Sequence, residues 1–87
     1  MTSTTDRVHA VVIEAIAESI SVDPATIQPD TAFEDDLGID STELIGIIVD
    51  IETALQVSLK GVDYAGLKTP ADLVAATLAR LRVAEPA

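Results

Sequence analysis

The chain has 87 residues, a formal net charge of −10 at pH 7 and 48% hydrophobic residues, with no cysteine and no tryptophan. This length suits one small domain, and the missing cysteines exclude disulfides, Cys-based zinc sites and thiol catalysis. The negative charge opposes binding to nucleic acid, and no stretch approaches the roughly 18 consecutive apolar residues of a membrane span. The N-terminal segment lacks the basic and apolar parts of a signal peptide. We therefore expect a single cytoplasmic domain over residues 1–87 that binds neither nucleic acid nor membrane.

The first predicted helix covers about residues 5–19 and is capped by Ser3 or Thr4. Its apolar residues recur at helical spacing and predict one buried stripe: Val8, Val11, Val12, Ala15 and Ile16. Ala17 is expected on the opposite, exposed side. His9 is the only histidine, and because no nucleophile lies beside it we interpret it as a half-exposed packing residue rather than as a base.

A long connection is predicted over residues 21–40. Its apolar residues are expected to anchor it over the helices: Val22, Ile27, Phe33 and Leu37. Asp23-Pro24 predicts one helical turn, because proline suits the first position of a helix, and Pro29-Asp30-Thr31 predicts a turn. Glu34-Asp35-Asp36 is an acidic cluster, but the spacing of a calcium-binding EF-hand loop is absent, so no metal site is predicted.

This connection ends where a second helix is expected, from Ser41 to Leu55. Asp40 is a good N-cap and Glu43 can complete a capping box with it, while Gly38 lets the backbone turn without a Cβ penalty. Ser41 then occupies the first helical position, at the positive end of the helix dipole and beside backbone N–H groups that lack a partner within the helix. A phosphate ester would suit this place, although an isolated Asp-Ser pair is most often a polar first turn and nothing more.

The second helix has apolar residues on two sides. Helical spacing predicts that one side is core: Leu44, Ile47, Ile48, Ile51 and Leu55. The adjoining side carries Thr42, Ile45 and Val49, edged by Glu43 and Asp50 on one flank and by Glu52 on the other. We interpret it as a docking surface for partners; the alternative is that its apolar residues pack under the long connection. Gly46 costs the helix roughly 0.5–1 kcal/mol relative to alanine, which is either offset by close packing or simply tolerated.

Residues 56–68 are expected to be irregular, with room for about one short helix within Val62–Leu67. Thr69-Pro70-Ala71-Asp72 predicts the start of a last helix, which reaches about Arg82. Its buried stripe is expected to contain Leu73, Val74, Thr77, Leu78 and Leu81. Residues 82–87 are expected to form a frayed tail. The predicted fold is therefore all-α, a small bundle of three main helices and one short helix with a long first loop.

Several motifs follow one another in a set order: Phe33, Asp36-Leu37-Gly38-Ile39-Asp40-Ser41, Glu43-Leu44-Ile45, Glu52 and Thr69-Pro70-Ala71-Asp72-Leu73. In this order, in an acidic domain of this length, the chain resembles an acyl carrier protein over almost its whole length. The resemblance implies a four-helix bundle. It also implies that Ser41 carries covalent 4′-phosphopantetheine through a phosphodiester, and that acyl groups are held as thioesters on the terminal thiol of this arm.

The resemblance also implies partners. These are a phosphopantetheinyl transferase and acyl- or aminoacyl-loading enzymes, ketosynthases or acyltransferases with basic docking patches. With the docking surface above, the expected recognition residues are Asp36, Asp40, Thr42, Glu43, Ile45, Val49, Asp50 and Glu52. The protein itself would be a monomer and a substrate of these enzymes, with no catalytic residue of its own.

Departures from the family pattern favour a specialised polyketide, aminoacyl or fatty-acid-like pathway over housekeeping fatty acid synthesis. Thr42 stands where leucine usually follows the serine, Gly46 where a glutamate is common, and Lys60-Gly61 where a proline and an acid are usual. The Leu-Gly-Gly-x-Ser pattern of peptidyl carriers is missing, because Gly38 is followed by Ile39-Asp40.

Two other classes of function are compatible with a small acidic helical domain. A carrier-like bundle could act as an adaptor or structural subunit without an arm, but such a protein needs no serine after Asp40. An enzyme has the least support, since the sequence offers no cysteine and no paired nucleophile and base.

Overall fold

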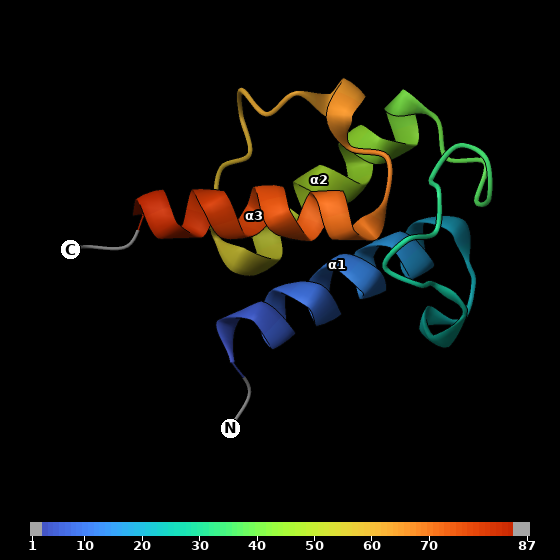
Figure 1. Cartoon of the computed structure of the whole chain (residues 1–87), viewed down its shortest axis with the longest axis horizontal. Helices are drawn as coiled ribbons and strands as arrows, with labels where there is room; N and C mark the ends of the chain where they lie inside the picture. The colour runs from blue at the N-terminus through green and yellow to red at the C-terminus, as the bar shows by residue number, and fades with distance from the viewer. Residues whose placement is uncertain (1–2, 85–87) are drawn as a thin grey trace.

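The computed structural model describes residues 3–84 and shows three α-helices joined by two irregular connections (Figure 1). The helices are α1 (Thr4–Ile20), α2 (Ser41–Leu55) and α3 (Pro70–Ala84). Each connection contains one 3-10 turn, η1 (Pro24–Thr26) or η2 (Tyr64–Gly66). Residues 3–84 contain no strand, so the predicted all-α fold is confirmed. The short helix expected within Val62–Leu67 is a single 3-10 turn.

The core forms where α1 packs against both α2 and α3. Helix and connection residues share one buried cluster, which includes Val8, Val12, Ile16, Phe33, Leu44, Ile47, Ile51, Leu59, Leu67 and Leu73. Leu55 and Leu81 are partly buried against it. The predicted inner side of α2 and the predicted stripe of α3 are therefore confirmed. Thr77, the one polar residue of that stripe, is fully buried, and its Oγ1 donates a hydrogen bond of 2.8 Å to the Leu73 carbonyl.

The start of each main helix follows local sequence chemistry. The Ser3 side chain accepts a hydrogen bond from the Asp6 N–H at α1, and the Thr69 hydroxyl accepts one from the Asp72 N–H at α3. The end of α3 differs from the expectation, since its backbone is helical to Ala84. The remainder of the predicted tail, residues 85–87, lies outside the described residues.

Two predictions on the first connection and its neighbours are wrong. Ala17 is buried rather than exposed, because the chain folds back after α1, with the Val22 N–H donating to the Ala17 carbonyl and η1 contacting the helix. The Val22 side chain is 38% exposed and is not a buried anchor, whereas Ile39, which was not expected as an anchor, is 4% exposed. Ile27 and Phe33 are buried as predicted, and Leu37 is half-buried.

Backbone hydrogen bonds tie the first connection to the segment that enters α3. The Phe33 N–H donates to the Lys68 carbonyl at 2.8 Å, and the Ala71 N–H donates to the Pro29 carbonyl at 3.0 Å. These bonds bring η2, far along the chain, beside the beginning of α2 (Figure 1). Within residues 3–84, no helix is long and apolar enough to cross a membrane.

Candidate functional site

Ser41 is exposed and is the first residue of α2. Asp40 is its N-cap, as predicted: Oδ1 accepts a hydrogen bond of 2.8 Å from the Glu43 N–H, which is one half of the expected capping box. The Asp40 carbonyl accepts from the Leu44 N–H at 3.0 Å. The backbone around the Ser41 hydroxyl is therefore fixed, and N–H groups of the first turn remain available to an anion.

The segment before Ser41 is held from both sides. Phe33 and Ile39 are buried, and the Ile39 N–H donates to the Phe33 carbonyl at 2.8 Å. Between them, Asp36 Oδ2 accepts a hydrogen bond of 2.8 Å from the Ala32 N–H. Gly38 has φ +64°, in the left-handed region that favours glycine. This closed loop leaves the carboxylates of Glu34 and Asp35 exposed beside the serine.

The outward side of α2 is free of contacts from the connection. Ile45 is 48% exposed and Val49 is 51% exposed, so the alternative that they pack under the long connection is wrong. At Gly46, apart from the glycine, its two neighbours and the adjacent backbone of α2, no atom of the described residues lies within 4 Å of the position that a Cβ would take. No described neighbour packs against Gly46 to offset its lower helix propensity.

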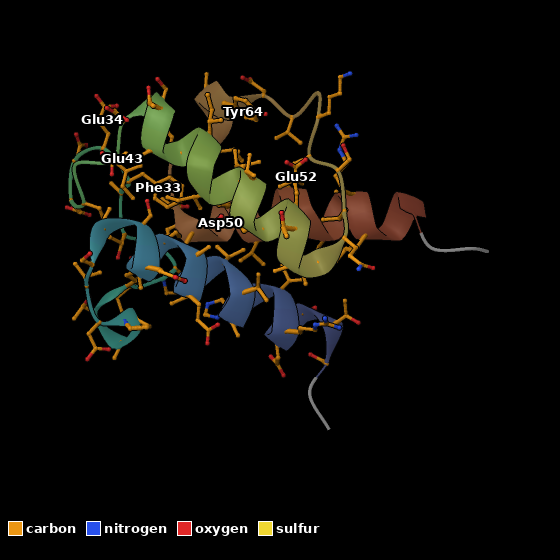
Figure 2. The ribbon with its side chains drawn as sticks, turned by 180° about the vertical axis from the view of Figure 1, so that it is seen from behind. Phe33, Glu34, Glu43, Asp50, Glu52 and Tyr64 are labelled. Carbon is orange, nitrogen blue, oxygen red and sulfur yellow. The ribbon has the colours of Figure 1, made fainter. Side chains whose placement is uncertain are left out.

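The carboxylates that edge this side have unequal roles. Figure 2 shows Glu43 and Asp50 on the flank of α2 that faces α1, and Glu52 on the opposite flank. Asp50 is exposed and Glu43 is half-buried. Glu52 Oε2 accepts a hydrogen bond of 2.7 Å from the Leu59 N–H, which fixes the connection after α2. Sequence reasoning assigned Glu52 to recognition only and missed this structural role, since no short-range motif links residues 52 and 59.

A cleft of about 760 Å³ opens beside Ser41, between the acidic segment and η2. Its floor is apolar and contains Phe33, Ile39, Leu44 and Leu67, all of them buried. Its polar lining residues are Glu34, Asp35, Asp40, Ser41, Tyr64 and Lys68. Tyr64 and Lys68 were not expected at the site, because 23 and 27 positions separate them from Ser41 in the sequence. An exposed hydroxyl on a rigid helix start, next to a partly apolar cleft, fits the attachment of a long flexible group.

The sequence pattern of the family described as "Phosphopantetheine attachment site" matches residues 10–77. The chain therefore belongs to this family, whose members carry 4′-phosphopantetheine covalently on a serine.

The similar proteins are acyl carrier proteins. The chain is 36% identical over 75 residues to the meromycolate extension acyl carrier protein of Mycolicibacterium smegmatis, covering 86% of this chain and 76% of that protein. It is 37% identical over 75 residues to the protein of the same name from Mycobacterium tuberculosis (strain H37Rv), covering 86% of this chain and 65% of the relative. With the acyl carrier protein of Exiguobacterium sibiricum the identity is 34% over 71 residues, covering 82% of this chain and 90% of the relative. The resemblance found in the sequence is confirmed: the chain is an acyl carrier that holds acyl groups as thioesters on a phosphopantetheine arm.

Proposed function

We propose that Ser41 is the residue that carries the arm. The observation that supports this most directly is its position: an exposed serine at the start of α2, capped by Asp40 and lining the cleft. Ser41 also lies inside the matched residues 10–77. When bound, the arm supplies a terminal thiol for the thioester; the chain itself supplies the hydroxyl and the geometry around it.

The residues next to Ser41 would position and stabilise the phosphodiester. Asp40 holds the helix start, so that first-turn N–H groups and the positive end of the dipole point toward the new anion. Gly38 and the Asp36 bond fix the loop that leads into it. The backbone that bears the hydroxyl is therefore held in place before a transferase arrives, which lowers the entropy cost of the encounter.

We further propose that the outward side of α2 is the surface recognised by partner enzymes. Ile45 and Val49, with Thr42, form an exposed apolar centre, and Asp50 and Glu43 give a negative flank. The partners would be a phosphopantetheinyl transferase and acyl- or aminoacyl-loading enzymes with basic patches, because opposite charge speeds encounter while apolar contacts slow release. Asp36, Asp40 and Glu52 would contribute charge, although each also accepts a backbone hydrogen bond within the chain.

The pathway that we propose is a specialised one, fatty-acid-like, polyketide or aminoacyl. Thr42, Gly46 and Lys60-Gly61 depart from the common family pattern, and two of the relatives above are named for meromycolate extension. We also propose that the protein is a cytoplasmic monomer forming one domain, that it has no catalytic activity, and that η2 takes the place of the short fourth helix.

Intact mass after incubation with coenzyme A and a broad-specificity transferase tests the attachment site. The wild-type chain should gain the mass of one arm, and Ser41→Ala should gain none while melting like the wild type, since Ser41 is exposed. Ser58→Ala, at another exposed serine, should be modified normally. Peptide mapping that places the arm on Ser3, Ser19, Ser21 or Ser58 would refute the assignment, and a wild-type chain that gains no mass would favour the adaptor.

A further inference from the structure

The cleft beside Ser41 is lined by several acidic residues and by one lysine. The whole chain has 5 lysine and arginine residues against 15 aspartate and glutamate residues. Among the side chains that the structure describes, Lys68 is the basic residue that lines this cleft, together with Glu34, Asp35 and Asp40. A lysine in this position is unexpected in so acidic a surrounding, and neither its sequence context nor the recognition surface on α2 accounts for it.

Two hydrogen bonds fix the backbone of Lys68 at the edge of the cleft. Its N–H donates a hydrogen bond of 3.1 Å to Asp72 Oδ2 in α3, and its carbonyl accepts one of 2.8 Å from the Phe33 N–H in the first connection. The backbone that bears the side chain is thus tied both to α3 and to the first connection. The side chain itself is exposed, so a charged group on a long flexible stem can turn toward the opening.

Tyr64 lies on the same wall and adds a neutral donor. It begins η2, where its carbonyl accepts a hydrogen bond of 3.1 Å from the Leu67 N–H, and Asp63 caps this turn through the Ala65 N–H at 3.0 Å. Tyr64 is 39% exposed and lines the cleft. Figure 2 shows it beside the first half of α2. Its phenolic O–H can donate to an anion that enters the cleft.

An arm on Ser41 brings a negative charge to a surface that is already negative. Its phosphodiester would lie next to Asp40 and near the carboxylates of the preceding loop, and neighbouring charges of the same sign repel each other. The start of α2 offsets part of this repulsion. A mobile cation on the other side of the same cleft would offset more of it, and it would favour arm positions that lean toward η2.

We propose that Lys68, assisted by the Tyr64 O–H, pairs with an anionic group of the arm and draws the arm into the cleft on the η2 side of α2. The inference rests on the proposed attachment at Ser41. The anion is either the phosphodiester of the arm or a carboxylate on the carried acyl group. A partner enzyme that takes the thioester would then have to break this pair, so Lys68 would influence how readily the arm leaves the cleft.

Melting temperatures of unmodified and arm-bearing protein test the pairing without any enzyme assay. The quantity compared is the change in Tm that the arm causes, measured in the wild type, in Lys68→Met and in Lys60→Met. Lys60→Met is the matched control, because Lys60 is an exposed lysine that does not line the cleft. At low salt, the arm should lower the Tm of Lys68→Met by about 2–4 °C relative to its effect on the other two proteins. High salt should remove this difference, and Tyr64→Phe should show a smaller one.

Different loads on the arm identify the anion. The arm-induced Tm change of Lys68→Met is compared with that of Lys60→Met under each load. If the two already differ with the bare arm, and an acetyl or malonyl load leaves this difference unchanged, Lys68 pairs with the phosphodiester. If the two Tm changes differ only when the arm carries malonyl, and not with acetyl or the bare arm, Lys68 pairs with the carboxylate of the carried acyl group. Equal arm effects in Lys68→Met and Lys60→Met under all three loads would overturn the inference. A chain that accepts no arm at all would instead refute the proposed function.

Discussion

Along α2, Ile47 and Ile51 are completely buried, whereas Ile45 and Val49, on the adjoining side of the same helix, are 48% and 51% exposed. The two pairs have the same kind of side chain and differ only in angular position. α1 packs against the inner side of α2, and the first connection ends at the start of α2. No described element therefore covers the outer side of α2. α2 therefore carries apolar side chains that are not buried in the core. Exposed apolar groups beside the proposed attachment serine support the proposal that partners contact this side.

The largest expected effect is on the inner side. Ile51→Ala should lower the free energy of unfolding by about 2–5 kcal/mol, because it removes buried methyl groups and leaves a cavity, out of a total of about 5–10 kcal/mol for a domain of this size. Urea unfolding measures this. Thr53→Ala, at an exposed position two residues further on, is the control and should remain within about 0.5 kcal/mol of the wild type. Equal transition midpoints for the two variants would mean that the assignment of the two sides is wrong.

A smaller effect is expected on the flank that faces the second connection. Glu52→Ala removes the carboxylate that accepts the Leu59 N–H, and it should cost about 1–2 kcal/mol of stability because hydrogen bonds to charged groups contribute more than neutral ones. Asp50→Ala is the matched control on the other flank, where the carboxylate is exposed. Chemical denaturation of both variants checks the prediction, and a Glu52→Ala curve that overlies the Asp50→Ala curve would contradict it.

The smallest effect on stability is expected on the outer side, where binding should change instead. Val49→Asp should leave the melting curve almost unchanged but raise the dissociation rate from a phosphopantetheinyl transferase at every salt concentration, because it removes an apolar contact. Asp50→Lys should mainly slow association and reduce its salt dependence. Stopped-flow binding at two ionic strengths separates the two rates. If the transferase modifies both variants at the wild-type rate, recognition involves another surface, and the region around Tyr64 is the next to test.

Local sequence chemistry predicted the helices and the place of Ser41 at the start of α2 well. α2 begins at Ser41 and ends at Leu55 as expected, because its capping aspartate and its apolar spacing act within a few residues of each other. The positive φ of Gly38 and the buried sides of α2 and α3 follow from equally short-range patterns. The assignment of the family also rests on motifs that are contiguous in the sequence.

Contacts between distant segments decided the rest. Ala17 is buried because the chain folds back over it, Glu52 is engaged because the second connection returns to it, and Lys68 lies in the cleft of Ser41 because its carbonyl pairs with Phe33. None of these pairings has a periodic or short-range signature, since each depends on how the two irregular connections pack over the helices. The sequence alone therefore determined the helices and the caps, and it carried the proposal that Ser41 bears the arm. The surroundings of that serine, which are made by residues on either side of α2 in the chain, are a property of the tertiary structure.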